Sequence, residues 1–440
     1  MLIQRFKTTP DRYFARSLLK QKRAVSAGNV FIDIKKLKQT HLGCGGAFSP
    51  SSGVIYDKLP EREKKRLLDL YFSDKGLRYN LGRIAIGSCD FAPYQYDCVD
   101  DKGRIDLSFD ERFVFPFIKD AKRYRGISLV ASCWSPLAKY KTNGEKANGG
   151  YLKDDAYVSH AAYLLDYVAK ARSSGLPIDY LTMQNEPLAK QVWESCLFTA
   201  QAEAKLVRAI AAEKENRGLG SLKLLVWDHN RDIIVARLDE TFADHECEKE
   251  THGIAFHDYD RTDAGNLSLV HEKHPGKPLF FTEGCVEFSR TDDEYKSGAK
   301  KRYGGALYYI KSLIENANNW TTAFIDWNLL LDSNGGPNHV ANYCEAPVMF
   351  DEHKRKLIVN PSYYAIKHFA HFVDEDARAV DVTNLSPACV CAYLNPDGSL
   401  VVIVLNNAGV SCNISIIIEN KEIVFDMEPD EIDTVKVEKQ

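Results

Sequence analysis

Two glutamates stand at the ends of short apolar segments, where their carboxyl groups could do acid–base or nucleophilic chemistry. Glu186 lies in DYLTMQNEPLAK, in which the apolar run 180–183 leads into a polar cluster that Pro187 closes. Glu283 lies in KPLFFTEG, at the end of another apolar run. Glutamate is uncommon in strands and proline interrupts a strand's hydrogen-bond ladder, so a turn explains Glu186 alone as well as catalysis does. Pro187 also predicts an extended backbone at Glu186, which would aim its side chain.

The elements that must position these carboxyl groups repeat along the chain. Between residues 41 and 330, strand-like apolar runs alternate with helical stretches. The expected strands cover residues 41–48, 81–88, 126–134, 179–185, 222–230, 252–259, 277–284 and 321–328. Helical spacing of apolar residues marks residues 60–73, 155–174, 305–317 and 361–373. This alternation predicts a (β/α)8 TIM barrel. An open doubly wound sheet is the alternative, although GCGG at 43–46 lacks the spacing of a dinucleotide-binding loop.

The character of the sequence changes near residue 375. Short alternating segments such as SLVVIVLNN and EIVFDM are separated by turn sequences such as NPDG, which is typical of an all-β module. FIDIKKL at residues 31–37 is expected to add a strand to it. The predicted fold class is therefore α/β, a TIM-barrel domain over residues 41–374 with an accessory C-terminal β-sandwich over residues 375–440. The N-terminal segment 1–40 is expected to contribute to the sandwich.

Polar and aromatic side chains crowd the carboxyl ends of the predicted barrel strands, where TIM barrels place their chemistry. They include Arg83, Asp90, Trp134, Asn185, Asp228, His229, His257, Tyr259, Trp327 and Asn328. Two carboxyl groups across a barrel mouth suit a retaining glycosidase, in which one protonates the leaving oxygen and the other attacks the anomeric carbon. Asn185 would then hold the sugar 2-hydroxyl, and the like-charged pair should raise the pKa of Glu186. Asp228 and His229 are expected to brace the mouth rather than touch substrate.

The composition narrows the class of protein. Of 440 residues, 45% are hydrophobic and 27% charged, and the net charge of −4 indicates no nucleic-acid partner. No apolar run of about 18 residues predicts a membrane span, and the basic N-terminus lacks the apolar core of a signal peptide. Eleven cysteines without a CxxC pair favour reduced thiols and a cytoplasmic location. No Cys/His cluster has the spacing of a zinc site, so no metal or other cofactor is expected. The sequence does not indicate the oligomeric state.

Eight motifs in this order resemble glycoside hydrolase family 30, which contains glucosylceramidases and related β-glycosidases. They are LGCGGAF, GRIAIGSCDF, ASCWSP, TMQNEP, WDHN, AFHDY, FTEG and DWNLLLDSNGGPNH, and they span roughly residues 41–370. NEP and TEG recur in related barrel families, whereas GSCDF together with WNLLLDSNGGPN is specific. The resemblance implies a TIM barrel with a side β-sandwich, in agreement with the pattern of predicted strands.

The resemblance also implies roles for individual residues. Glu186 would be the general acid/base and Glu283 the nucleophile. The implied substrate-binding residues are Arg83 supporting the nucleophile, Asp90, Trp134 and Asn185 on sugar hydroxyls, His257 and Tyr259 flanking Glu283, Trp327 as sugar platform, and Asn342 as a further contact. Departures from the family pattern are Cys133 in SCWSP, His339 in GGPNH, where tryptophan is common, and the run HFAHFVDEDARAV.

The sequence thus predicts a retaining, exo-acting β-glucosidase of the glucosylceramidase type, with a carbohydrate as its substrate. A β-xylosidase or a β-1,6-glucanase is the alternative within the family, because the expected sugar contacts hardly distinguish these substrates. A non-catalytic glycan-binding protein is the alternative from another class. It would be expected to lack one of the two carboxyl groups, whereas Glu186 and Glu283 are both present.

Overall fold

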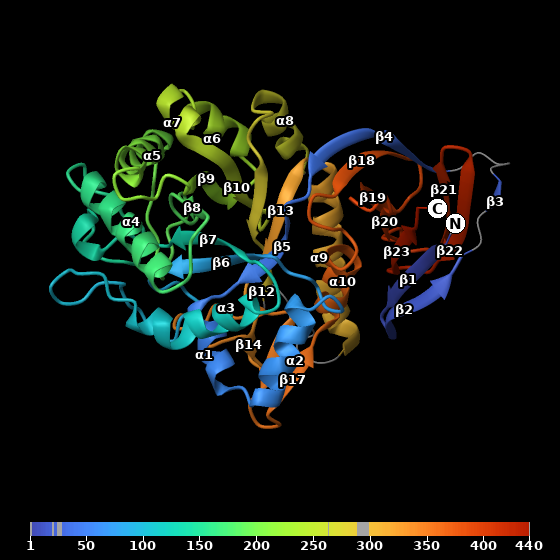
Figure 1. The fold of residues 1–440 in the computed structure, drawn as a ribbon, viewed down its shortest axis with the longest axis horizontal. Helices are drawn as coiled ribbons and strands as arrows, with labels where there is room; N and C mark the ends of the chain where they lie inside the picture. Colours follow the sequence, from blue (N-terminus) through green and yellow to red (C-terminus); the bar gives the residue numbers. More distant parts are fainter. Residues whose placement is uncertain (1, 20–21, 24–28, 263, 288–298, 440) are drawn as a thin grey trace.

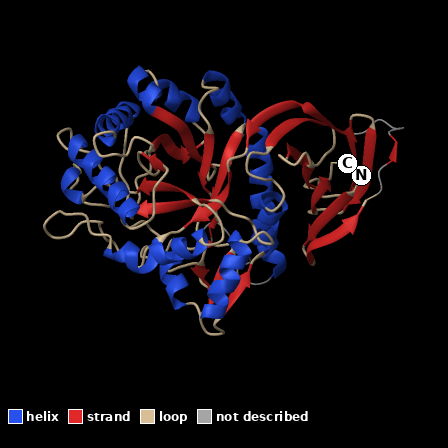
Figure 2. Ribbon diagram, in the orientation of Figure 1, coloured by secondary structure: helices blue, strands red, loops and turns tan. Residues whose placement is uncertain are grey.

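The computed structural model describes residues 2–19, 22–23, 29–262, 264–287 and 299–439. The chain forms two parts that lie side by side, a barrel surrounded by helices and a domain made of strands (Figures 1 and 2). Two helices of the barrel, α9 and α10, lie between the barrel strands and the second domain (Figure 1). The chain termini both lie in the second domain.

The barrel is a closed sheet of eight parallel strands in the order β10-β11-β13-β5-β6-β7-β8-β9. Its strands are β5 (Gly43–Ala47), β6 (Leu81–Ile86), β7 (Ser128–Cys133), β8 (Tyr180–Thr182), β9 (Lys223–Asn230), β10 (Thr251–His257), β11 (Leu279–Glu283) and β13 (Thr321–Asp326). Each lies within or overlaps one of the predicted strands, so the TIM-barrel prediction is confirmed.

The glycine-rich sequence at 43–46 is explained by close approach of two strands. Gly45 of β5 lies so near β6 that an added Cβ atom would stand 2.1 Å from the carbonyl oxygen of Leu81. Only glycine allows this approach, so GCGG is a barrel strand and not a phosphate-binding loop. Apolar side chains that include Leu81, Val130 and Phe280 are buried together in a separate small cluster contributed by the barrel strands.

Helices cover the outside of the barrel. They are α1 (Pro50–Lys58), α2 (Glu61–Phe72), α3 (Phe115–Lys122), α4 (Tyr157–Ser173), α5 (Ala200–Lys214), α6 (Ile234–Thr241), α7 (His245–Glu250), α8 (Gly265–Lys273), α9 (Ala299–Asn318) and α10 (Pro361–Ala370). The four predicted helical stretches correspond to α2, α4, α9 and α10, with α9 beginning earlier than expected. Among the described residues, no helix combines the length and the apolar character needed to cross a membrane.

The second domain is a ten-stranded sheet in the order β2-β1-β23-β20-β19-β18-β4-β21-β22-β3. Its strands are β1 (Ile3–Thr9), β2 (Arg12–Leu18), β3 (Lys22–Arg23), β4 (Val30–Thr40), β18 (Arg378–Asn384), β19 (Cys389–Leu394), β20 (Leu400–Leu405), β21 (Cys412–Ile418), β22 (Lys421–Met427) and β23 (Ile432–Val437). The N-terminal strands thus pair with the C-terminal ones. Buried aliphatic side chains such as Val30, Val402 and Ile416 form the core of the domain.

Two small sheets lie outside the barrel sheet. β14 (Leu331–Asp332), β16 (Val348–Asp351) and β17 (Lys356–Val359) form one small sheet, and β12 (Val286–Glu287) pairs with β15 (Cys344–Glu345). None of these strands was expected, because two to four residues carry no periodic signal. The β12–β15 pairing brings the segment after Glu283 beside the segment after Asn342.

Candidate active site

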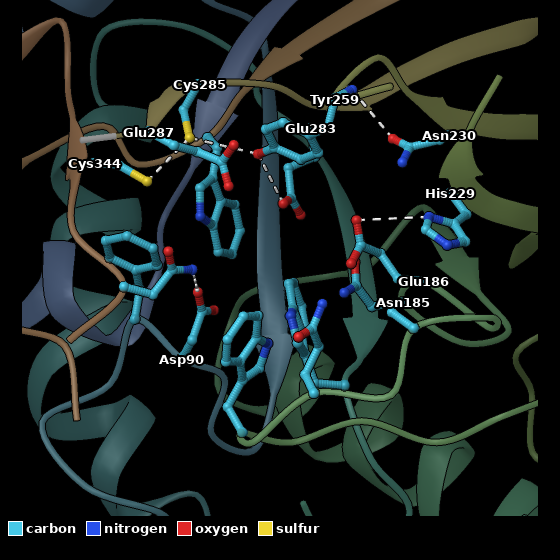
Figure 3. A pocket seen from close by; sticks show the side chains of 17 residues that line it. Asp90, Asn185, Glu186, His229, Asn230, Tyr259, Glu283, Cys285, Glu287 and Cys344 are labelled. Atoms are coloured by element: carbon cyan, nitrogen blue, oxygen red, sulfur yellow. Dashed lines mark hydrogen bonds and ion pairs between the residues drawn. The ribbon is translucent and has the colours of Figure 1, made fainter. Parts of the chain in front are cut away.

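A pocket of about 150 Å³ opens at the carboxyl ends of the barrel strands. Its lining residues are Asp90, Phe91, Trp134, Asn185, Glu186, Ala189, Gln191, Trp193, His229, Asn230, Tyr259, Glu283, Cys285, Glu287, Trp327, Asn342 and Cys344. Of the ten residues predicted from the sequence, all but Arg83 and His257 line this pocket. Figure 3 shows the carboxyl groups of Glu186 and Glu283 both pointing into it.

The backbone at Glu186 is not extended. Its φ of 45° lies in the left-handed region, which costs a non-glycine residue on the order of 1–3 kcal/mol. Two hydrogen bonds to neighbouring strands fix this turn, because the Glu186 N–H donates to the carbonyl of Asp228 over 3.0 Å and the Asn185 N–H donates to that of Cys133 over 2.9 Å. The prediction that Pro187 would hold Glu186 extended is therefore wrong, since contacts distant in sequence override the local preference.

Glu283 is the last residue of β11, and two donors point at its carboxylate. Arg83 Nη1 donates to Oε2 in a short contact, and the hydroxyl of Tyr259 donates to Oε1 over 3.0 Å. Both donors favour the ionised form of the carboxylate. Each oxygen thus has a partner before any substrate arrives.

Arg83 lies beneath the pocket, fully buried in the middle of β6. Besides Glu283, its guanidinium donates to Asp228 Oδ2 over 2.9 Å and to Asn185 Oδ1 over 2.8 Å. Its flat face lies 4.7 Å from the ring centre of Trp134. A buried cation is tolerated when its hydrogen-bond donors are satisfied by this kind of geometry. Arg83 therefore orders residues from several strands and does not line the space for a ligand.

His257 is the residue that links the other glutamate to the same network. Its Nδ1 lies 3.2 Å from Glu186 Oε1, and its Nε2 lies 3.2 Å from Asp228 Oδ1. Burial lowers the pKa of His257, but Glu283, Asp228 and Glu186 together raise it to about 9. The imidazole is therefore a cation at neutral pH. His257 was expected to flank Glu283, and it does lie opposite Glu283 in the pairing of β10 with β11, while its side chain contacts Glu186 and Asp228.

The two glutamates differ in their ionisation. Burial raises the pKa of Glu186, but the contacts with His257 and His229 outweigh it and hold that pKa below its ordinary value. Burial raises the pKa of Glu283 above its ordinary value, and the charge of Glu186 adds to the effect. The prediction that the like-charged pair would raise the pKa of Glu186 is thus wrong for the ligand-free protein. His257 and His229 account for the difference.

A third carboxyl group, Asp90, faces the pocket from the loop after β6. Asn342 donates to Asp90 Oδ2 over 2.9 Å, and Figure 3 shows Asp90 at one side of the pocket. Burial and the charge of Glu283 raise the pKa of Asp90 to about 8. The group is therefore mostly protonated at neutral pH and can donate a hydrogen bond to a ligand.

Indole rings form part of the wall. Trp134 and Trp327 stack with ring centres 5.3 Å apart at an angle of 24°, and Phe91 meets Trp327 edge-on at 5.9 Å. Both indoles are nearly buried, with 2–3% of their surface exposed. Aromatic faces of this kind hold the apolar faces of ligand rings while polar neighbours fix their orientation.

Several lining residues were not expected from the sequence. His229 was expected only to brace the barrel mouth, yet it lines the pocket beside Glu186 (Figure 3). Its position at the end of β9, in WDHN, was a usable signal. Trp193 and Gln191 lie in the segment after β8, and Glu287 lies in the two-residue strand β12; neither segment carries a sequence signal of its position.

Two residues that differ from the family pattern, His339 and Cys133, have structural explanations. His339 does not line the pocket; its Nε2 forms an ion pair with Glu194 Oε2 at 3.3 Å, and its Nδ1 lies 3.2 Å from the carbonyl of Ala92. It thereby ties together three loops around the mouth. Cys133 is buried at the end of β7, where its thiol donates to the carbonyl of Ser135 over 3.1 Å.

Three potential metal ligands also meet here, although the sequence showed no cluster with metal-site spacing. Glu186, His229 and His257 each offer a donor atom, and these atoms lie within 4.8 Å of one another. They come from the ends of three neighbouring strands, so their spacing along the chain gave no signal.

Comparisons with known proteins agree with this arrangement. The family model described as the glycosyl hydrolase family 30 TIM-barrel domain matches residues 42–373, and that of the family 30 beta sandwich domain matches residues 376–435. The lysosomal acid glucosylceramidase of Mus musculus is 30% identical over 390 residues, covering 83% of this chain and 75% of the relative. The endo-1,6-beta-D-glucanase of Neurospora crassa is 25% identical over 408 residues, covering 84% of this chain and 80% of the relative.

A solved structure is also very similar. SrfJ from Salmonella typhimurium superposes with a TM-score of 0.95 at 30% identity, and the match covers 100% of both chains. The β-sandwich expected from the C-terminal strand pattern is thus shared with a protein of known structure. The two domain matches and the barrel-mouth carboxyl groups show that this chain belongs to glycoside hydrolase family 30.

Proposed function

We propose that this glycoside hydrolase is a retaining, exo-acting β-glucosidase of the glucosylceramidase type. The observation that carries the proposal is the unequal setting of its two glutamates. Glu283 accepts hydrogen bonds from Arg83 and Tyr259, whereas Glu186 contacts the histidine His257. The two donors stabilise the ionised form of Glu283 against the burial that raises its pKa, and Glu186 lies next to a group that carries a proton.

In the first step, a Glu283 oxygen attacks the anomeric carbon and the bond to the leaving oxygen breaks. Glu186 gives a proton to that oxygen. In the ligand-free protein this proton resides on His257. A sugar that fills the pocket removes water from Glu186, which raises its pKa, so the proton can pass across the 3.2 Å contact from Nδ1 to Glu186. His257 thereby supplies the proton and Glu186 delivers it.

In the second step, Glu186 takes a proton from a water molecule, which attacks the anomeric carbon of the glycosyl-enzyme. Glu283 leaves as a carboxylate. The hydrogen bonds from Arg83 and Tyr259 stabilise the charge that returns to it. Two inversions at the same carbon give net retention of configuration.

Exo action is supported by the size of the pocket. Sites for drug-sized ligands hold about 300–1,000 Å³, whereas this pocket holds about 150 Å³, which suits a single sugar ring. Asp90 and Asn342 lie together at one side and would meet hydroxyl groups of that ring. Trp327 would pack against its apolar face. Glucose as the sugar is supported by the name of the mouse relative.

A β-1,6-glucanase is the second candidate, favoured by the name of the Neurospora crassa relative. The discriminating experiment supplies β-1,6-glucan and follows the products with time. Release of glucose alone supports exo action, and early release of longer oligosaccharides supports an endo-glucanase. A panel of nitrophenyl β-glucoside and β-xyloside separates a glucosidase from a β-xylosidase.

The roles of the carboxyl groups are tested by Glu283→Gln and Glu186→Ala. Glu283→Gln should abolish turnover of nitrophenyl β-glucoside. Glu186→Ala should retain slow formation of the glycosyl-enzyme from this activated substrate, and azide should speed its release as a β-glycosyl azide. Wild-type turnover in either variant would refute the proposal, and binding without any turnover in the wild type would favour a glycan-binding protein.

A further inference from the structure

Glu186 and His257, which act in the proposed hydrolysis, also form a cluster with His229 that has the composition of a metal site. Two imidazoles and one carboxylate are ligands that zinc and similar divalent transition metals prefer. Each of the three residues offers one donor atom, and these atoms lie within 4.8 Å of one another. Glu186 and His229 line the pocket, so an ion can reach them from solvent.

The two separations measured from Glu186 Oε1 fit tetrahedral coordination. Zinc bonds of about 2.0–2.2 Å place neighbouring tetrahedral donors about 3.4 Å apart. Glu186 Oε1 lies 3.2 Å from His257 Nδ1 and 3.6 Å from His229 Nδ1. The second contact is too long for a hydrogen bond. Among the described residues His229 Nδ1 has no hydrogen-bond partner, although it is buried and faces Glu186 (Figure 3).

The surroundings of His257 also resemble those of a metal ligand. Histidines that bind metals usually donate their other ring nitrogen to a carboxylate, which fixes the ring and increases its basicity. Here Asp228 Oδ1 lies 3.2 Å from His257 Nε2, which leaves Nδ1 directed at Glu186. Asp228 is itself held by Arg83 and Thr282, so the ring is oriented before an ion binds.

The local charge favours a divalent cation. When His257 is neutral, Glu186, Asp228 and Glu283 carry three negative charges against the single positive charge of Arg83. An ion of charge +2 balances the remaining two.

We propose that Zn²⁺ binds at Glu186, His229 and His257 and thereby reversibly blocks the site. The ion occupies the Glu186 oxygen and the imidazole nitrogen that proton transfer to a leaving group requires. It also stands beside the space for the sugar. Zn²⁺ is thus an inhibitor and takes no part in hydrolysis, and the binding itself does not depend on which glycoside the protein hydrolyses.

Isothermal titration of the full chain with ZnCl₂ tests the binding, and Co²⁺ is the spectroscopic probe. One Zn²⁺ per chain should bind, and Co²⁺ should give the intense visible bands of a tetrahedral site. Loss of an outer partner costs about 10–100-fold in metal affinity, so removal of a ligand in His229→Gln should weaken binding at least about tenfold. Glu186→Gln should do the same, and circular dichroism shows whether each variant is folded.

His274 offers a matched control, because its Nδ1 lies 3.0 Å from Glu248 Oε1 in a histidine–carboxylate pair remote from the pocket. His274→Gln should leave Zn²⁺ binding unchanged. No binding at millimolar Zn²⁺, or binding that folded His229→Gln and Glu186→Gln retain at full strength, would overturn the proposal. If Zn²⁺ binds as expected but β-glucosides are not hydrolysed, the metal site stands and the proposed function fails.

Discussion

The hydroxyl of Tyr259 donates a hydrogen bond to Glu283 Oε1 over 3.0 Å, on the opposite side of the carboxylate from Arg83. The tyrosine comes from the segment after β10 and the glutamate from the end of β11, so the contact depends on adjacent barrel strands. It fixes the orientation of the carboxylate that the proposed mechanism uses as nucleophile.

Tyr259→Phe should therefore lower kcat/KM without unfolding the protein. A hydrogen bond to a charged group is worth about 1.5–3 kcal/mol, which corresponds to about a 10–100-fold loss. Steady-state kinetics with a nitrophenyl glycoside measure the change. The control is Tyr124→Phe, because Tyr124 donates to Asp69 over 3.0 Å at the surface. Equal activity of Tyr259→Phe and the wild type would contradict this role.

Removal of the guanidinium in Arg83→Met should affect stability as well as activity. The change leaves Asp228 and Glu283 buried without their cation, and breaking a buried pair in this way costs about 3–5 kcal/mol. Urea denaturation followed by circular dichroism measures the free energy of unfolding. Arg112→Met, which breaks an exposed ion pair with Asp57, serves as control and should leave the unfolding midpoint unchanged. An Arg83→Met variant as stable as the wild type would show that the network does not hold the barrel mouth together.

Stability should fall as the pH rises from about 6.5 to 9. His257 has a pKa of about 9 in the folded protein, above the ordinary value of 6.5, so the folded state binds its proton more tightly. The protonated imidazole therefore contributes on the order of 3 kcal/mol to the free energy of unfolding. This contribution is complete below pH 6.5, the ordinary pKa, and is lost as the pH rises through about 9.

Thermal unfolding midpoints of the wild type and His257→Asn across this pH range provide the test. Asp90, with a raised pKa of about 8, acts in the same direction in both proteins, so the difference between the two curves reports His257 together with its effect on the pKa values of Glu186 and Glu283. Parallel curves would mean that His257 is not protonated in the folded protein.

His339→Ala should change substrate binding more than turnover. The imidazole contacts Glu194 and the carbonyl of Ala92, so its loss frees the loop that carries Asp90. One or two such contacts correspond to about 1 kcal/mol, or several-fold in KM. The contact with Glu194 raises the pKa of His339, so the wild-type KM should increase as His339 loses its proton at higher pH, and this dependence should vanish in His339→Ala. A pH-independent ratio of the two KM values would contradict the role.

The sequence predicted the barrel and the two strand-end glutamates because apolar strands and amphipathic helices leave periodic signals. It also located most of the pocket, because the carboxyl ends of parallel strands converge in a closed barrel. The backbone conformation of Glu186 could not be predicted from the sequence. Hydrogen bonds to β7 and β9 set a positive φ there, and these partners lie far away in sequence.

The ionisation of Glu186 and the residues of the outer pocket wall could not be predicted from the sequence, for a related reason. The low pKa of Glu186 comes from His229 and His257, which reach it only when β9 and β10 pair in register. Cys344 and Glu287 enter the wall through two-residue strands that carry no periodicity. Properties that depend on residues from several strands can be determined only once the folded structure shows which residues meet.

The central claim is that Glu283 forms a covalent bond to the sugar, and trapping with a 2-fluoro β-glucoside tests it most directly. The fluorine slows both steps because both pass through oxocarbenium-like transition states, and an activated leaving group such as fluoride speeds the first step alone, so the glycosyl-enzyme should accumulate. Mass spectrometry of the intact chain should show one added fluoroglucosyl group, and peptide mapping should place it on Glu283. A protein that hydrolyses β-glucosides but carries the label on another residue, or takes up no label at all, would contradict the account.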